Sequence, residues 1–201
     1  EFVFDQAWEY PLTTDQWIQN WAKCRGGNQD RHILKAWDSL HKKIYKKYAT
    51  AGQAVLMNAR PMLVGTDSWN TYPDINNRDL WDIWTEMLKA SHINNTGYRF
   101  DVINVGRQVL GNLFSSFRDH FTQCYSEKDI DGMKKWADQM DALLIDTDRL
   151  LSCETNFSIG KWIDDARSFG KTEAEKEYYE ENARCILTVW GQKATQLNDY
   201  A

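Results

Sequence analysis

Apolar residues recur at every third or fourth position along most of this chain, which is the spacing of one face of a helix. Between residues 30 and 48, for example, the apolar face consists of Ile33, Trp37, Leu40, Ile44 and Tyr48. The chain has 3 prolines among its 201 residues and few runs of β-branched side chains. The pattern therefore predicts an all-α fold, with helices over about residues 1–8, 13–25, 30–48, 77–93, 99–123, 126–151, 159–169 and 172–190.

Three of these helices begin at a sequence typical of a capping box, in which two side chains three residues apart each bond the other's backbone N–H. The three sequences are Thr13-x-x-Gln16, Ser126-x-x-Asp129 and Thr172-x-x-Glu175. Asn77 is the predicted cap of the helix at 77–93, because a short polar side chain can accept a bond from the first turn. The pair Gly26-Gly27 predicts the end of the second helix.

The two longest predicted helices, 99–123 and 126–151, are joined by a short turn and should pack antiparallel. Residues 49–76 interrupt the helical pattern with an extended stretch at 55–64 and a turn-rich run at 65–73. A loop of this length is uncommon inside a helical domain and tends to be functional. The predicted architecture is an irregular antiparallel helical bundle with one long loop insertion.

Charge and cysteine spacing exclude several classes of partner. The net charge of −5 argues against nucleic acid or a membrane as the main partner, because both favour a basic face. The basic run from His41 to Lys47 is predicted to be the solvated end of a helix. The 4 cysteines lie far apart, which does not suit a zinc site. Buried free thiols are the first expectation, and one or two disulfides are the alternative.

The sequence contains no recognisable catalytic set. The neighbouring carboxylates Asp146/Asp148, Asp164/Asp165 and Glu180/Glu181 would point to different sides of a helix and cannot form a facing acid–base pair. The histidines are scattered, so no metal site is predicted, and no glycine-rich cofactor loop occurs. We therefore expect no catalytic residue, no metal and no cofactor in this chain.

Tryptophan is the unusual component, with 10 residues. Most should lie in the core, but a few could line a pocket for a ring-shaped ligand. The last predicted helix ends at Trp190-Gly191, and the polar stretch that follows carries Asp199 and Tyr200. An indole, a phenol and a carboxylate together can bind a sugar. From the residues alone, Trp190 and Tyr200 could equally well close the bundle.

The same residues carry a family resemblance. The stretch from Arg184 to Gly191, with Leu197-Asn198-Asp199-Tyr200-Ala201, resembles the helical C-terminal domain of alpha-N-acetylglucosaminidases, glycoside hydrolase family eighty-nine. Weaker matches in the same order are Ala59-Arg60-Pro61 with Ser68-Trp69, Tyr98-Arg99-Phe100-Asp101-Val102, Arg107-Gln108, Trp162 through Arg167, Glu173-Ala174-Glu175, Tyr179-Glu180 and Asn182.

The resemblance implies a division of the chain and of the chemistry. Residues 1–10 would be the end of the last helix of a missing upstream (β/α)₈ barrel, and residues 11–201 a helical domain truncated at its C-terminal end. Both catalytic carboxylates of the retaining mechanism would lie before Glu1, so this segment alone should be inactive. The implied partners are that barrel and the terminal alpha-linked N-acetylglucosamine of a glycan. The implied location of the parent enzyme is secreted, periplasmic or lysosomal.

The resemblance also implies roles for single residues. Trp190 and Tyr200 fall near the family's sugar pocket, so Trp190 is expected as an apolar wall and Tyr200 as a hydroxyl contact or positioning group. Arg107 and Arg184 match family arginines and are expected in buried structural pairs. Two alternatives stay open: a stand-alone helical module that binds a glycan or a protein, and an architectural bundle whose tryptophans are all buried.

Overall fold

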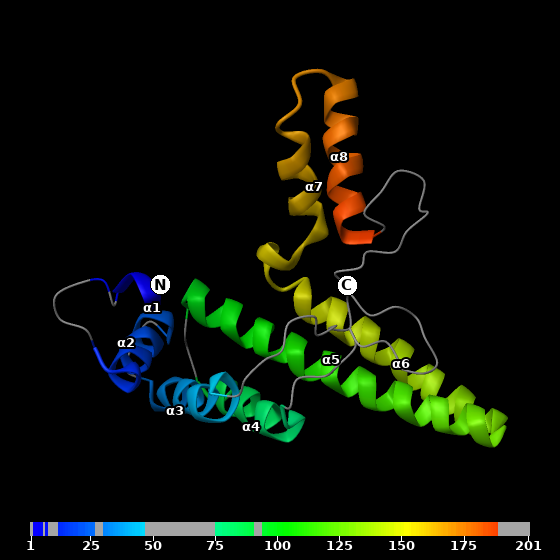
Figure 1. The fold of residues 1–201 in the computed structure, drawn as a ribbon, viewed down its shortest axis with the longest axis horizontal. Helices are drawn as coiled ribbons and strands as arrows, with labels where there is room; N and C mark the ends of the chain where they lie inside the picture. Colours follow the sequence, from blue (N-terminus) through cyan, green and yellow to red (C-terminus); the bar gives the residue numbers. More distant parts are fainter. Residues whose placement is uncertain are drawn as a thin grey trace. The chain divides into compact units, whose positions relative to one another are not determined.

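The computed structural model describes residues 2–5, 7, 12–26, 30–46, 75–90 and 94–188, and within these residues the chain is all-α, as predicted. The elements in Figure 1 are α1 (Phe2–Asp5), α2 (Thr14–Gly26), α3 (Arg31–Ser39), the π-helix η1 (Leu40–Tyr45), α4 (Asn77–Met87), α5 (Thr96–Glu127), α6 (Ile130–Leu151), the 3₁₀-helix η3 (Thr155–Phe157), α7 (Ile159–Arg167) and α8 (Glu173–Thr188). The loop insertion predicted at 49–76 falls almost entirely outside the described residues, so it stays a prediction.

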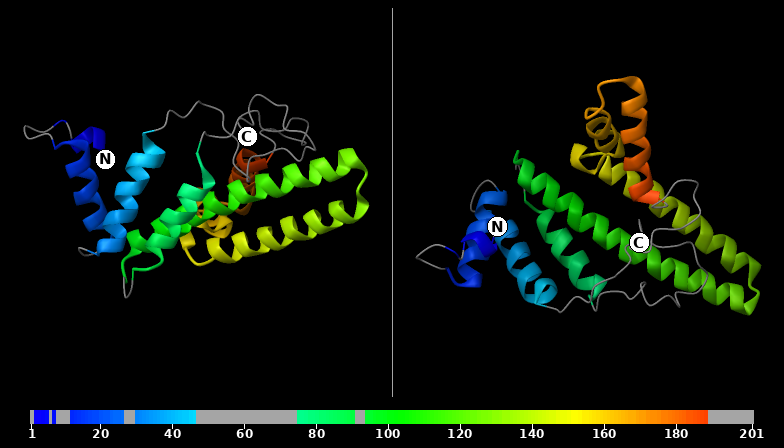
Figure 2. Two further views of the ribbon diagram at one scale, coloured as in Figure 1. Left: turned by 90° about the horizontal axis from the view of Figure 1, so that it is seen from below. Right: turned by 45° about the horizontal axis from the view of Figure 1, so that its top comes forward.

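The chain divides into two compact units. Unit 1 comprises Glu1–Thr50 with Pro73–Leu113, and unit 2 comprises Ala51–Tyr72 with Phe114–Ala201. Helix α5, one continuous helix in Figure 2, contributes residues 96–113 to unit 1 and residues 114–127 to unit 2. None of the described helices combines the length and the apolar character needed to cross a bilayer.

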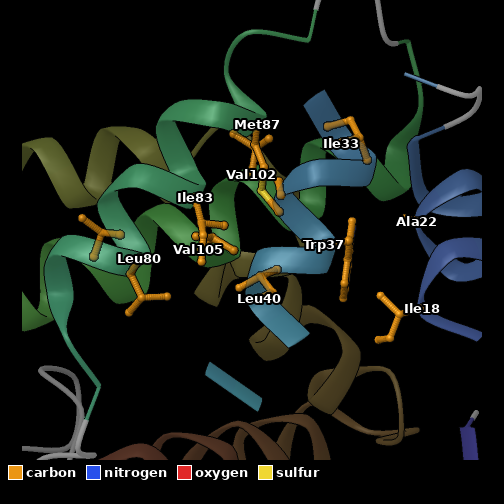
Figure 3. Close-up of a cluster of buried hydrophobic side chains, with 12 residues drawn as sticks. Ile18, Ala22, Ile33, Trp37, Leu40, Leu80, Ile83, Met87, Val102 and Val105 are labelled. Atoms are coloured by element: carbon orange, nitrogen blue, oxygen red, sulfur yellow. The ribbon is translucent and has the colours of Figure 1, made fainter. Parts of the chain in front are cut away.

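Unit 1 has a well-defined hydrophobic core built by α2, α3, η1, α4 and the first half of α5 (Figure 3). Met87 and Val109 are fully buried in it. Each such side chain contributes about 1.5–3 kcal/mol by leaving water. The apolar face predicted for the helix at residues 30–48 is confirmed for its described residues. Ile33, Trp37 and Leu40 are buried, and Ile44 packs against them.

Two of the three predicted capping boxes are confirmed. At α2 the Thr13 N–H donates to Gln16 Oε1 over 3.0 Å, and the Gln16 N–H donates to Thr13 Oγ1 over 3.3 Å. At α8 the Thr172 N–H and the Glu175 side chain make the corresponding pair. These reciprocal bonds satisfy backbone donors that the first helical turn leaves without a helical acceptor.

The third predicted box is wrong. Ser126 lies inside α5, where its hydroxyl donates to the Thr122 carbonyl, and Asp129 alone caps α6 by accepting from the Gly132 N–H. The helix before it continues to Glu127, four residues beyond its predicted end, and begins at Thr96 rather than Arg99. A lysine, Lys128, takes the left-handed conformation (φ 58°) that ends α5. The chain then reverses within two residues.

The predicted cap of α4 is displaced by one residue. Asn76, not Asn77, accepts from the Arg78 N–H over 2.9 Å. The Asn77 amide instead donates to the Val109 carbonyl of α5 over 3.2 Å and accepts from Asn112. Two consecutive asparagines are equally suited to a cap, so the packing of α4 on α5 selects which one serves.

The predicted helix at 30–48 is divided into α3 and the π-helix η1. Asp30 caps α3 by accepting from the N–H groups of His32 and Ile33. The basic run at its end is solvated at Lys42, Lys43 and Lys46, but His41 is buried and lies 3.2 Å from Asp15 of α2. The prediction of a fully solvated end is therefore wrong at His41, because the wider turn places this side chain against α2.

In unit 2 the second half of α5 packs antiparallel on α6, as predicted. The Trp136 ring of α6 stacks on His120 with centroids 4.4 Å apart and contacts Phe117 at 5.4 Å. No disulfide joins any two of the four cysteines, which all lie in the described residues, but the expectation of buried thiols is wrong: Cys24 and Cys153 are exposed, and Cys124 and Cys185 are half-buried. The tryptophans are also less buried than the architectural alternative requires, because Trp81 and Trp162 are 44% and 46% exposed.

Candidate functional site

The two residues predicted to face the sugar, Trp190 and Tyr200, lie outside the described residues. The structure therefore does not test their roles. Helix α8 ends at Thr188, two residues before Trp190 in the chain. The described part of the candidate site is therefore the α7–α8 hairpin (Figure 1), because α8 is the last described helix before Trp190 in the sequence.

The turn of this hairpin is closely packed. Gly170 lies so near the first turn of α8 that a Cβ there would be 2.5 Å from the Lys176 nitrogen and 2.8 Å from the Glu175 carbonyl carbon. Glu175 accepts the N–H groups of Lys171 and Thr172, and the bond from the Thr172 N–H contributes most to lowering the pKa of the Glu175 carboxyl. The start of α8 is thus fixed by a glycine and a capping carboxylate together.

A chain of charged side chains joins α7 to α8. Arg167, at the end of α7, donates from Nη1 to Glu180 Oε2 over 2.7 Å and from Nη2 to Glu173. The other Glu180 oxygen accepts from Arg184 over 2.7 and 2.8 Å. Hydrogen bonds from Arg167 are the largest cause of the lowered pKa of both carboxyls. We call Arg167, Glu173, Glu180 and Arg184 the hairpin ion network.

A further bond joins the start of α7 to the second half of α8. The Trp162 indole N–H of α7 donates to the Ala183 carbonyl of α8 over 3.3 Å, although nearly half of the ring stays exposed. At the other end, the Phe169 ring lies 6.0 Å from the Tyr179 ring, which contacts Tyr178 at 5.6 Å. The hairpin therefore presents aromatic surface as well as charge.

The neighbouring carboxylates singled out in the sequence are either paired with cations or exposed. Asp146 is paired with Arg149, Asp165 with Lys161, and Glu180 with two arginines. The neighbouring carboxylates Asp148, Asp164 and Glu181 are exposed. Across the described ranges, no group of three or more histidine, cysteine, aspartate or glutamate side chains could hold a metal ion.

Arg184 and Arg107, the two arginines predicted in buried structural pairs, differ in burial and in partner. Arg184 is paired with Glu180, but its side chain is 56% exposed, so the prediction of burial is wrong. Arg107 is half-buried in α5 and donates to Asn104 Oδ1 over 2.9 Å. Burial lowers the pKa of Arg107.

Sequence reasoning missed a charged contact between distant segments of unit 1. Arg25 of α2 forms two bonds to Asp101 of α5, at 3.0 and 2.5 Å, and donates to the Gly97 carbonyl. The Trp21 and Phe100 rings lie 5.5 and 5.6 Å from its guanidinium carbon. Asp101 belongs to the family-like motif at 98–102, but nothing in the sequence pointed to Arg25 as its partner.

A second missed feature is the buried carboxylate Glu86 of α4. His32 Nδ1 lies 2.9 Å from one of its oxygens, and Lys89 and Lys35 lie 2.9 and 3.3 Å from the other. These bonds, first that of His32, lower the pKa of Glu86 to about 2. The carboxylate borders a cavity of about 320 Å³ that is also lined by Ser39, Lys43, Asp82, Ile83 and Thr85.

We predict that unit 1 loses stability in acid because Glu86 becomes protonated. Because its pKa is lowered from 4.5 to about 2, the ionised carboxylate stabilises the fold above pH 4.5 and loses this effect as the pH falls toward 2. Glu86→Gln should reduce the free energy of unfolding at pH 6 by on the order of 1–2 kcal/mol, allowing for solvent screening at the lysines. Urea unfolding at pH 6 and pH 2.5 checks this: the difference should shrink to a minor fraction at pH 2.5, and a difference as large as that at pH 6 contradicts it.

The comparisons with known proteins decide the family. A family model described as the alpha-N-acetylglucosaminidase (NAGLU) C-terminal domain matches residues 17–201. The chain belongs to this family. Among curated proteins, human alpha-N-acetylglucosaminidase is 28% identical over 190 residues, which cover 92% of this chain and 25% of the human protein. The alpha-N-acetylglucosaminidase C-terminal domain family thus accounts for nearly all of this sequence.

Solved structures show the same likeness at the level of the fold. Two structures of a family 89 glycoside hydrolase from Clostridium perfringens, one in complex with its substrate GlcNAc-alpha-1,4-galactose and one with PUGNAc, each match with a TM-score of 0.87 at 25% identity. Each match covers 98% of this chain and 24% of the Clostridium chain. The chain therefore spans about a quarter of the length of the relatives that it matches.

Proposed function

We propose that this chain is the non-catalytic helical domain of an exo-acting, retaining alpha-N-acetylglucosaminidase. In this proposal it packs on a catalytic (β/α)₈ barrel of the same polypeptide and helps to wall the pocket for the terminal N-acetylglucosamine of a glycan. The observation that carries the proposal is the family match over residues 17–201. The relatives are about four times longer, which leaves room for a separate catalytic part.

The chemistry of the described residues supports placing catalysis elsewhere. A retaining glycosidase needs two carboxyl groups about 5–5.5 Å apart on either side of the scissile bond. The carboxylates considered above are either paired with arginine or lysine or exposed on helix surfaces. The segment alone is therefore proposed to be inactive, with the nucleophile and the general acid on the barrel.

Exposed apolar surface on the hairpin supports a packing partner. Helix α7 leaves Ile159 60% exposed, and Phe169 just beyond its end is 74% exposed, while α8 leaves Tyr178 and Ile186 more than half exposed. Exposed apolar side chains gathered on one element can form part of an interface. In the proposed enzyme the barrel covers part of this surface. From the family resemblance we propose that the parent protein is a secreted, periplasmic or lysosomal enzyme.

We assign the sugar contacts to the stretch after α8. Trp190 would present its indole face to the apolar side of the N-acetylglucosamine ring, and Tyr200 would bond or position a sugar hydroxyl. The proposal rests on the family-like motif that contains both residues and on the family match that reaches residue 201.

The proposal predicts a loss of catalytic efficiency when these contacts are removed from the complete enzyme. Trp190→Ala and Tyr200→Phe should each lower kcat/KM for an aryl alpha-N-acetylglucosaminide by about tenfold, since a lost pocket contact costs about 1–3 kcal/mol. Trp81→Phe, at an exposed ring of α4 outside the hairpin, is the control aromatic change, and it should leave kcat/KM within about twofold. Unchanged kinetics in both pocket variants would remove these residues from the site.

A stand-alone binding module is the competing function, and the exposed aromatic rings of the hairpin are the observation in its favour. Titration of this 201-residue chain with N-acetylglucosamine, followed by tryptophan fluorescence, separates the two. We expect no saturable change, because the pocket needs the barrel. Saturable binding by the isolated chain would favour the module.

A further inference from the structure

Glu180 occupies the middle of α8 with both carboxylate oxygens engaged. Oε2 accepts from Arg167 of α7 over 2.7 Å, and Oε1 accepts from Arg184, one turn closer to the end of α8. The side chain is 24% exposed, so these bonds are only partly screened by water. The carboxylate therefore links the neighbouring helix to the final turns of α8.

One turn beyond Glu180, the Trp162 indole bonds the Ala183 carbonyl. Helix α8 is thus held to α7 at two successive levels by polar bonds, and by the tight turn at Gly170 where it begins. Polar bonds at both levels restrain the tilt of α8 more strongly than the turn and a single bond would. Figure 1 shows α8 running antiparallel beside α7 over this length.

We propose that Glu180 is a positioning residue for the sugar pocket, in that its bonds to Arg167 and Arg184 set the direction in which α8 delivers the stretch carrying Trp190. This inference rests on the proposed function, because it supposes that the stretch after Thr188 meets the substrate. Glu180 touches no substrate itself. It acts through the orientation of the helix.

The length of α8 makes the orientation matter. Eight residues separate Glu180 from Thr188, which corresponds to about 12 Å along the helix axis. A tilt of about 5° at Glu180 would displace the helix end by about 1 Å, and a misplacement of about 1 Å in an active site can cost as much as 100-fold in rate. Loss of the two bonds would therefore lower activity by displacing the end of α8, although Glu180 does not contact the sugar.

The test uses the complete parent enzyme and a matched pair of variants. Glu180→Gln removes the charge from the hairpin ion network, and Glu181→Gln makes the same change at the exposed neighbour. For an aryl alpha-N-acetylglucosaminide we expect kcat/KM to fall about tenfold in Glu180→Gln, mainly through KM, and to stay within about twofold in Glu181→Gln. The unfolding midpoint should fall by no more than about 3 °C, as for a partly exposed ion pair.

A merely structural role would lower the midpoint and leave KM unchanged, and that result would overturn the inference. An equal loss in Glu181→Gln would overturn it too. If Glu180→Gln does not fold, Arg167→Lys keeps the charge but loses the bridge between Glu173 and Glu180, and it should raise KM in the same way. Failure of both variants to fold would make the hairpin ion network structural. A wild-type enzyme that does not cleave the glycoside would instead defeat the proposed function.

Discussion

Replacement of Arg25 by methionine is expected to reduce the stability of unit 1 by about 3 kcal/mol, the low end for breaking a buried ion pair. The substitution leaves Asp101, whose side chain is 11% exposed, without its two bonds from the guanidinium. It also removes the cation that lies near the Trp21 ring and near the Phe100 ring. Hydrogen exchange of the α3 amides in this 201-residue chain measures the loss.

The pH dependence of this loss is a second signature. Burial is the largest cause of the raised pKa of Asp101, and the hydrogen bonds of Arg25 oppose it. Without Arg25 the pKa should rise further, so the penalty should shrink as the pH falls and Asp101 takes up a proton. Lys23→Met, on the exposed side of the same helix, is the control and should change stability by less than about 0.5 kcal/mol. Equal effects of the two variants would show that the Arg25–Asp101 pair is not important for stability.

Gly170→Ala is expected to destabilise the α7–α8 hairpin strongly. The added methyl group would lie 2.5 Å from the Lys176 nitrogen, and backbone cannot move aside as a flexible side chain can. We expect a loss of about 2 kcal/mol, so that the α8 amides exchange about thirtyfold faster. To make room for the methyl group, the turn at residue 170 must move away from the first turn of α8. This movement should also weaken the bonds that Glu180 makes to α7.

Gly160→Ala is the matched control for this change. The nearest neighbour of a Cβ at Gly160 is Ser158 Oγ at 3.4 Å, an ordinary contact, and the residue lies in α7. Alanine favours a helix over glycine by about 1 kcal/mol, so this variant should be neutral or slightly more stable. If Gly170→Ala is as stable as Gly160→Ala, the close approach at the turn does not limit the hairpin.

The local elements of this fold could largely be predicted from the sequence. Capping boxes at Thr13 and Thr172 are recognisable because a cap depends on side chains only three residues apart. The failures at Asn77 and Ser126 are also local, but there two candidate caps compete and tertiary contacts decide. The π-helix that buries His41 likewise depends on its packing against α2, which periodicity does not reveal.

The pairs between distant segments could not be predicted. Arg25 and Asp101 are separated by 76 positions, and Glu86 lies 54 positions from His32. These partners are brought together by the packing of helices, and hydrophobic spacing does not predict which helices pack against each other. Family resemblance supplied what the physics of one sequence does not, namely the enzyme class and the importance of the stretch ending at Tyr200. The roles of Trp190 and Tyr200 stay predictions.

The most direct test of the central claim is a structure of the complete parent enzyme with N-acetylglucosamine bound. If this helical domain walls the pocket, the Trp190 ring should contact the sugar, with carbon atoms about 4 Å apart, and α8 should point its C-terminal end at the barrel. A sugar whose nearest atom lies more than about 10 Å from every residue of this domain, beyond the reach of any direct contact, would contradict the account.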